Sequence, residues 1–157
     1  MNSVKVMDDE HHKWEHYFWT NEKKAIPQTV KWFQDHGFIV KELRELPREV
    51  YDEQIESIIE EFADQKFAAA ADIARFAITS EHGGFYMDMD FAPLIWDNEF
   101  LYYFDSILWR EGLCDDQIAL NTYAFIVKPK HEAISIYLDL IRKTHHKDTR
   151  DHYIHNR

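Results

Sequence analysis

The sequence predicts an α/β fold in a minimal single domain, and three observations support this. The chain has 157 residues, 45% of them hydrophobic and 15% aromatic, which is enough for one hydrophobic core. Residues 16–40 run in the order strand, helix, strand, which is typical of a partly parallel sheet. Helical patterns then alternate with further apolar runs, so we expect a mixed sheet flanked by helices.

The first elements follow a polar lead-in at residues 1–13. The aromatic, β-prone segment at residues 16–20 predicts a strand. Pro27 lies where a helix would begin and Gly37 where it would end. The buried side of this helix is expected to comprise Val30, Trp32 and Phe33. A short second strand is predicted at residues 38–40.

The rest of the chain contains three more helical patterns and three strand-like runs. Apolar residues at helical spacing predict amphipathic helices from Tyr51 to Phe62 and from Ile134 to Ile141. An alanine-rich helix is expected between them, from about Phe67 to Glu81, ended by Gly83-Gly84. The predicted strands cover residues 85–91, 100–104 and 122–127.

The charge and the cysteine content restrict the class of protein. A net charge of −11 argues against nucleic acid or an anionic membrane as the main partner. The one cysteine, Cys114, excludes an internal disulfide and fits a reducing compartment. The N-terminus lacks the apolar run of a signal peptide, and no stretch is long and apolar enough to span a membrane. A cytoplasmic location is therefore expected.

The segment Phe85–Phe91 carries the first chemical signal. Apolar residues alternate there with Tyr86, Asp88 and Asp90, so one edge of a strand would face the core and the other would carry two carboxylates about 7 Å apart. Paired carboxylates favour a divalent metal that also takes the oxygens of a phosphate-bearing ligand. A solvated acidic loop is the alternative.

A second signal lies on the preceding helix, at Asp72 and Arg75. Their spacing of three residues places both side chains on one helical face. A surface ion pair of little energetic consequence is the plain interpretation. Their position just before a Gly-Gly turn and a Tyr-x-Asp-x-Asp edge favours a shared site.

Residues 71–90, Ala-Asp-Ile-Ala-Arg-Phe-Ala-Ile-Thr-Ser-Glu-His-Gly-Gly-Phe-Tyr-Met-Asp-Met-Asp, resemble a known family pattern. The family is the glycosyltransferases with a DXD-containing sugar-binding region, including Och1-like mannosyltransferases and the catalytic domains of the large clostridial glucosylating toxins. Its pattern is an Ala-Asp-Ile-x-Arg helix, a Gly-Gly turn and Tyr-x-Asp-x-Asp. The opening strand with Trp19, and Asn121 before an apolar run, are similar to other parts of the family, so that the resemblance spans roughly residues 14–142.

The resemblance implies a GT-A-like (Rossmann-like) fold and transfer of a sugar, with retention, from a UDP- or GDP-sugar donor. It implies that Asp88 and Asp90 are the catalytic pair at a divalent metal, Mn²⁺ or alternatively Mg²⁺. Asp90 would bind the metal that bridges the diphosphate, and Asp88 would contact the ribose and sugar and reach the metal through water. The acceptor, whether glycan, lipid or protein, is not implied.

The remaining donor contacts that the resemblance implies surround this pair. Asp72 and Arg75 would hold hydroxyls of the transferred sugar. Trp19 would stack on the base and Phe18 would line the same pocket, with a plain core tryptophan as the alternative. Tyr86 would buttress the diphosphate, or simply pack, and Asn121 would complete the substrate-binding set.

Two other functions are alternatives to this one. Longer relatives carry a C-terminal Ser-x-Trp segment over the donor, which this sequence lacks, so a non-catalytic module that binds nucleotide sugar and metal is the runner-up. Haloacid-dehalogenase-like phosphatases also use Asp-x-Asp, but they place threonine soon after it, where this chain has Phe91-Ala92-Pro93. The weaker candidate sites are Asp115-Asp116, His131-Glu132, and the histidines His145, His146, His152 and His155.

Overall fold

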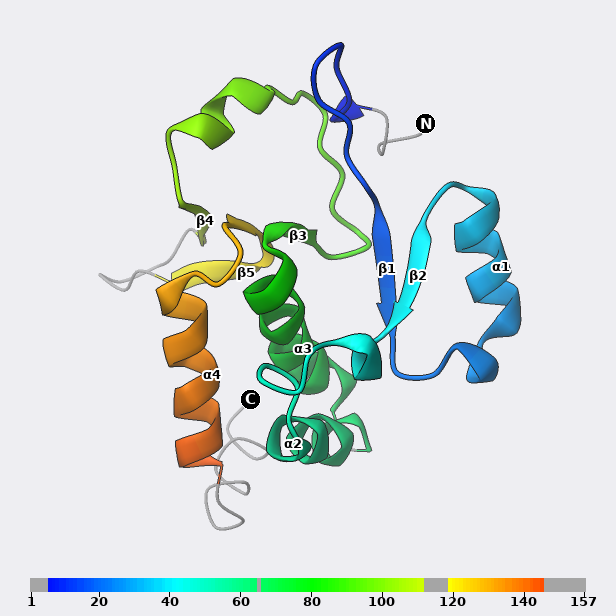
Figure 1. Ribbon diagram of the computed structural model, residues 1–157, viewed down its shortest axis with the longest axis vertical. Coiled ribbons are helices and arrows are strands. Elements are labelled where there is room, and N and C mark those ends of the chain that lie inside the picture. Colours follow the sequence, from blue (N-terminus) through cyan, green and yellow to red (C-terminus); the bar gives the residue numbers. More distant parts are fainter. Residues whose placement is uncertain (1–5, 65, 112–118, 146–157) are drawn as a thin grey trace. The chain divides into compact units, whose positions relative to one another are not determined.

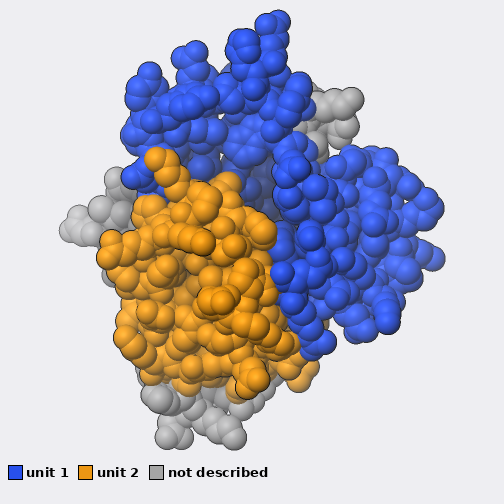
Figure 2. Space-filling view, viewed as in Figure 1, with its two compact units in different colours: residues 1–45, 85–126 blue, residues 46–84, 127–157 orange. Residues whose placement is uncertain are grey.

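The structure is a computed structural model, shown in Figure 1, that describes residues 6–64, 66–111 and 119–145. It confirms the mixed α/β architecture, which is consistent with a GT-A-like fold. The chain divides into two compact units, coloured separately in Figure 2. The first unit comprises residues 1–45 and 85–126, and the second comprises residues 46–84 and 127–157. The prediction of one 157-residue domain stays a prediction.

The first unit begins with the predicted strand, helix and strand. Strands β1 (Tyr17–Thr20) and β2 (Ile39–Glu42) pair in parallel, with Tyr17 opposite Ile39. The connection between them contains a 3-10 helix, η2 (Lys23–Ala25), and helix α1 (Pro27–Asp35), and β2 is followed by η3 (Leu43–Glu45).

Helix α1 packs on this strand pair through only part of the predicted face. The buried ring of Phe33 stacks on Phe18 of β1 at a centroid distance of 3.9 Å. The prediction that Trp32 is buried is wrong, because its side chain is 54% exposed. Trp32 instead stacks at 4.0 Å on His36, the residue that directly follows the helix.

A second sheet of the first unit has the strand order β3-β5-β4, with β3 at Gly84–Met87, β4 at Ser106–Glu111 and β5 at Ala119–Val127. The Asp88 amide donates to the Tyr123 carbonyl at 2.7 Å, and the ring of Tyr86 packs on that of Phe125. Residue numbers increase along β3 in the direction in which they decrease along β5, so the two strands are antiparallel. The predicted strand at residues 122–127 is confirmed and extends to Ala119.

The predicted strand at residues 100–104 is wrong. This segment begins with a 3-10 helix, η4 (Asn98–Tyr102), which Asp97 caps by accepting a hydrogen bond from the Glu99 amide at 2.9 Å. Phe100 packs on Trp96 at 5.1 Å, whereas Tyr102 and Tyr103 are exposed. Aromatic residues have a high propensity for strands, but the cap at Asp97 and the contact of Phe100 with Trp96 favour a helical turn here. The next segment, residues 106–111, forms the strand instead.

The second unit contains the three helices α2 (Glu53–Ala63), α3 (Phe67–His82) and α4 (Glu132–Thr144), with α3 in contact with both others (Figure 1). All three were predicted. The apolar side chains that they bury include Ile55, Ile58, Ile59, Ile73, Phe76, Ala77, Ile134 and Leu138. Asp52 caps α2 by accepting from the Ile55 amide at 2.8 Å and also accepts from Arg142 of α4 at 2.7 Å.

Helix α3 ends at Gly83, which prepares the entry into β3. Gly83 has φ +62° and ψ −150°, a conformation that is essentially restricted to glycine. A Cβ atom on Gly83 would lie 2.4 Å from the Pro129 nitrogen, and nearby the Lys130 amide donates to the Ser80 carbonyl at 2.8 Å. Gly84 has φ +89°, but a Cβ there would meet nothing within 4 Å. Both glycines thus adopt a backbone conformation that disfavours other residues, and only at Gly83 is there also no space for a side chain.

Several sequence predictions fall outside the described residues: those on Cys114, Asp115-Asp116, His146, His152 and His155. His131 is described, and its ring nitrogen caps α4 by accepting from the Ala133 amide at 3.2 Å. In the described part of the chain, every helix is too short or too polar to cross a membrane.

Candidate functional site

The two aspartates of the Asp-x-Asp motif lie on a turn that follows β3. The strand ends at Met87, and the Phe91 amide donates to the Asp88 carbonyl at 3.0 Å, which closes the turn. The predicted strand at residues 85–91 is therefore too long, and Met89 is 82% exposed instead of facing the core. Once the Phe91 amide bonds within the turn, it cannot continue the ladder with β5.

Asp88 is fixed by its neighbours, whereas Asp90 faces solvent. The Tyr86 hydroxyl donates to Asp88 Oδ1 at 2.8 Å, and the Tyr86 ring stacks at 5.5 Å on Phe125, which is 1% exposed. The Asp88 amide is held by the Tyr123 carbonyl, as described above. Asp90, two residues further along the turn, is exposed. One carboxylate is thus oriented in advance and the other is open to a ligand.

Aromatic rings anchor the turn from the apolar side. Phe85 stacks on Trp96 at 5.0 Å and on Trp109 of β4 at 5.9 Å, and Phe91 lies 6.0 Å from Phe85. Phe91 also contacts Tyr123 at 6.0 Å. Aromatic pairs at these separations add to the stability that burial provides. Phe85 of β3 and Phe91 at the end of the turn therefore belong to one aromatic cluster.

Asn121 lies on the central strand β5 with a polar atom that lacks a partner. The residue is 2% exposed, and its Oδ1 accepts from the Tyr123 amide at 2.8 Å. Its buried Nδ2 makes no hydrogen bond in the structure. An unpaired buried donor costs about 1–3 kcal/mol, so a water or a ligand oxygen is the expected partner.

Asp72 and Arg75 are brought together on α3 in the second unit. Arg75 Nη2 lies 3.0 Å from Asp72 Oδ1, and the Arg75 Nε donates to the Ala71 carbonyl at 3.3 Å. The Arg75 side chain is 7% exposed and that of Asp72 is 42% exposed. The pair is therefore not a plain surface ion pair, because its cation is buried. A buried guanidinium requires a nearby anion, which Asp72 supplies.

Phe18 and Trp19, on β1 in the first unit, differ in surroundings. Phe18 is stacked on Phe33 of α1, so its ring is part of the packing of that helix. Trp19 stacks on Tyr17 with an interplanar angle of 28°, and it is partly exposed. Successive strand residues point to opposite faces, so these two rings are directed apart. Their roles in donor binding stay predictions.

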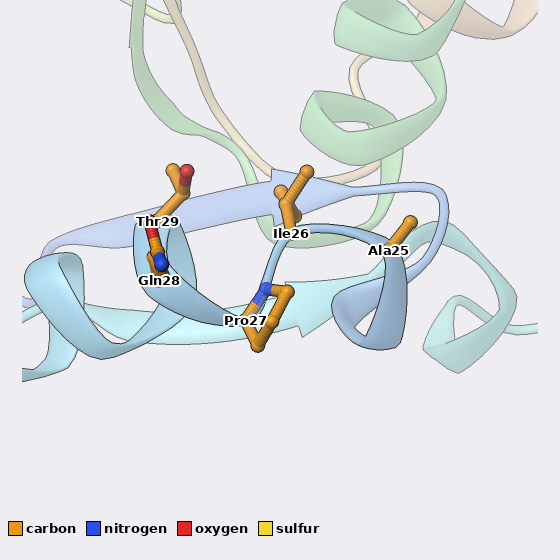
Figure 3. A pocket seen from close by; sticks show the side chains of 5 residues that line it. All are labelled: Ala25, Ile26, Pro27, Gln28 and Thr29. Carbon is orange, nitrogen blue, oxygen red and sulfur yellow. The ribbon is translucent and has the colours of Figure 1, made fainter.

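An open depression with a volume of about 370 Å³ lies where η2 leads into α1 in the first unit (Figure 3). Its lining comes from consecutive residues at the start of that helix: Ala25, Ile26, Pro27, Gln28 and Thr29. None of these side chains is charged, and none was predicted to bind substrate. We do not assign the depression to the donor.

The turn offers the carboxylates of Asp88 and Asp90 to the predicted divalent metal. Among the described residues, no three histidine, cysteine or acidic side chains converge as a metal-holding group. Mg²⁺, however, is commonly held by one or two carboxylates together with substrate phosphates. The exposed Asp90 and the oriented Asp88 fit this second arrangement, in which a diphosphate completes the coordination.

Sequence reasoning did not identify the supports of this turn. Phe125 and the Tyr123 carbonyl hold Tyr86 and Asp88 from β5, more than 30 residues away along the chain. The available signal was the apolar run after Asn121, which predicts a strand but not its partner. Antiparallel pairing of that strand with β3 is what makes it part of the site.

Comparison with known proteins gives a family for the chain. A family model described as a glycosyltransferase sugar-binding region containing a DXD motif matches residues 1–108. The match includes every residue of the predicted donor and metal site except Asn121. Comparison with curated proteins gave no significant match. Because the matched region covers more than half of the sequence, the chain belongs to the family of glycosyltransferases with a DXD-containing sugar-binding region.

Proposed function

We propose that the chain is a metal-dependent glycosyltransferase that takes a sugar from a UDP- or GDP-sugar donor, with retention at the anomeric carbon. The observation that carries this proposal is the Asp88–Phe91 turn, where one carboxylate is held by the Tyr86 hydroxyl and the next is exposed. This arrangement suits a ligand that brings its own negative oxygens and shares a cation with the protein.

The two carboxylates would bind different parts of the ligand. Asp90 is open to solvent and would contact the cation directly, with Mn²⁺ as the first choice and Mg²⁺ as the second. Asp88, oriented by the hydrogen bond from the Tyr86 hydroxyl, would accept from a ribose or sugar hydroxyl. When bound, the cation would stabilise the negative charge that develops on the leaving diphosphate.

Asp72 and Arg75 would hold the transferred sugar. The 42% exposed carboxylate of Asp72 can accept a sugar hydroxyl while it keeps its contact with Arg75. The Arg75 guanidinium is directed by the carbonyl of Ala71 and by Asp72, so it would act without a large loss of side-chain entropy. These two roles are taken from the family pattern, which the sequence matches residue by residue.

A donor screen tests this function. The native chain is incubated with a panel of UDP- and GDP-sugars and Mn²⁺, and both donor binding and release of the nucleoside diphosphate are measured. We expect binding of at least one donor and release of its diphosphate. Asp88→Asn keeps the size of the side chain but removes its charge, and we expect at least about a tenfold loss of affinity, equivalent to about 1.4 kcal/mol.

Glu99→Gln is the matched control, because Glu99 is an exposed acid of the same unit that lies outside the turn. It removes the same charge and should leave binding unchanged. Donor binding without any release of diphosphate would favour the non-catalytic module over the enzyme. If no nucleotide sugar binds, or if both variants lose affinity equally, the assignment of the site is wrong.

A further inference from the structure

A hydrogen-bonded chain of three side chains lies in the first unit, outside the turn. The Asp9 carboxylate lies 2.9 Å from His12 Nδ1, and His12 Nε2 lies 2.7 Å from the Tyr102 hydroxyl. Asp9 Oδ1 also accepts from the amides of His11 and His12, both at 2.7 Å. The order carboxylate, imidazole, hydroxyl is the one that activates hydroxyl nucleophiles in many enzymes.

The ionised carboxylate of Asp9 determines which nitrogen of His12 carries a proton. A hydrogen bond from Asn98 holds the pKa of Asp9 well below its usual range, helped by the bonds from the His12 ring and from the amides of His11 and His12. An ionised carboxylate only accepts, so Nδ1 of His12 carries the proton. When the imidazole is neutral, Nε2 carries a lone pair to which the Tyr102 hydroxyl can donate. In this tautomer the phenol proton lies against the base that would remove it.

Asn98 holds the carboxylate end in place. Its side chain amide is buried, at 5% exposure, and donates to Asp9 Oδ2 at 2.7 Å and to the Met7 carbonyl at 2.9 Å. Its Oδ1 accepts from the indole nitrogens of Trp14 and Trp96 at 2.8 Å and 2.9 Å. Because every polar group of this amide is hydrogen-bonded, Asn98 holds the Asp9 carboxylate in a defined position.

The hydroxyl end is open to a reagent. Tyr102 is 72% exposed, although its hydroxyl is bonded to His12. The next residue, Tyr103, is 78% exposed, and its hydroxyl has no hydrogen-bond partner among the described residues. The chain thus contains two neighbouring exposed phenols, of which one is paired with a base. Tyr103 is a natural internal control.

We propose that Tyr102 is an acceptor for a glycosyl group, with His12 as its general base; this rests on the proposed function. The bond between the anomeric carbon of the donor sugar and its diphosphate oxygen breaks, and its electron pair leaves with the diphosphate. A bond forms between the Tyr102 oxygen and the anomeric carbon, and the phenol proton passes to His12 Nε2. Asp9 is a positioning residue that stabilises the resulting imidazolium.

Mass spectrometry tests the proposal. The native chain is incubated with Mn²⁺ and the panel of UDP- and GDP-hexoses, and intact mass and peptide mapping locate any added hexose. We expect one hexose on Tyr102 in the native chain and in Tyr103→Phe, and none in Tyr102→Phe. His12→Gln can still hydrogen bond to the phenol but is not a base, so it should slow the addition on the order of a hundredfold.

Two further readings separate this proposal from the proposed function. Release of nucleoside diphosphate is measured in the same samples, and release without hexose on Tyr102 would overturn the acceptor while the transferase stands. If no donor binds, the transferase and the acceptor role both fail. Acetylation by N-acetylimidazole then reports on the phenols without any donor. Equal rates at Tyr102 and Tyr103, or a rate at Tyr102 that His12→Gln leaves unchanged, would show that the contact only ties the two segments together.

Discussion

Replacing Gly83 by alanine should destabilise the chain more than the same change at Gly84. Both residues have positive φ, +62° and +89°, and an alanine in such a conformation costs about 1–3 kcal/mol. Only Gly83 adds overlap, since its Cβ would lie 2.4 Å from the nitrogen and 2.5 Å from Cδ of Pro129. Neither atom belongs to a flexible side chain, so the overlap adds about 1–3 kcal/mol. The reduced entropy of the unfolded chain returns about 0.4–1 kcal/mol in both variants. We therefore expect a loss of about 1 kcal/mol for Gly84→Ala and about 2–4 kcal/mol for Gly83→Ala.

Urea unfolding followed by two probes checks this difference. All five tryptophans lie in residues 1–45 and 85–126, so tryptophan fluorescence reports on the first unit. Far-UV circular dichroism reports on helices α2, α3 and α4, and Gly83 lies directly after α3. With a typical slope of about 2 kcal/mol per molar urea, the midpoint by circular dichroism should fall about 1 M lower for Gly83→Ala than for Gly84→Ala. Equal midpoints for the two variants would refute the steric argument, and an unchanged midpoint for both would refute the conformational one as well.

Two other predictions concern ion pairs. Asp52→Ala removes the cap of α2 and the ion-pair partner of Arg142, and we expect the free energy of unfolding in urea to fall by about 1–2 kcal/mol. Asp52→Asn can still cap the helix, so its free energy of unfolding should fall by less. An equal decrease in both variants would show that the cap does not contribute separately from the ion pair. Bonds from Lys23, from the Glu42 amide and from Lys41 lower the pKa of Glu45 from 4.5 to about 2. The folded chain thus binds this proton less readily than the unfolded chain, so the contribution is present above pH 4.5 and is lost as the pH falls toward 2. Because Glu45 and its lysine partners are partly exposed, Glu45→Gln should lower the free energy of unfolding by only about 0.5–1 kcal/mol at pH near 7, and by less near pH 3. Urea unfolding followed by tryptophan fluorescence measures both values. An equal decrease at the two pH values would contradict this prediction.

Most helices could be predicted from the sequence because their signals are local. Apolar residues at helical spacing, Pro27 at a start and Gly83 at an end were enough to predict α1, α2, α3 and α4 within a few residues. The errors arose where tertiary contacts decide. The rings at residues 100–104 have strand propensity, but the cap at Asp97 and the contact of Phe100 with Trp96 favour η4. Trp32 follows the apolar pattern of α1 yet lies outside the contact with β1.

The sequence predicts which residues form the candidate site, which stays a prediction, and it foresaw only part of the geometry that the structure gives them. The spacing of Asp72 and Arg75 placed them on one face of α3, and their 3.0 Å contact confirms it. Alternation predicted that Tyr86 and Asp88 share a side, and the hydrogen bond between them agrees. The turn that ends β3 at Met87 depends on pairing with β5, which the local sequence does not reveal. The chain from Asp9 to Tyr102 joins residues some 90 positions apart, beyond any local pattern.

The proposed function requires that the turn at Asp88–Phe91 binds a nucleoside diphosphate through a shared cation, with Asp90 as the direct ligand. The most direct measurement is the affinity of the chain for UDP and GDP as Mn²⁺ is titrated, for the native protein, Asp90→Asn and the control Glu99→Gln. We predict that the native chain and the control bind one of these nucleotides only when Mn²⁺ is present, and that Asp90→Asn loses at least about tenfold in affinity. Binding that is independent of Mn²⁺, or that Asp90→Asn retains with the same dependence on Mn²⁺, would contradict it.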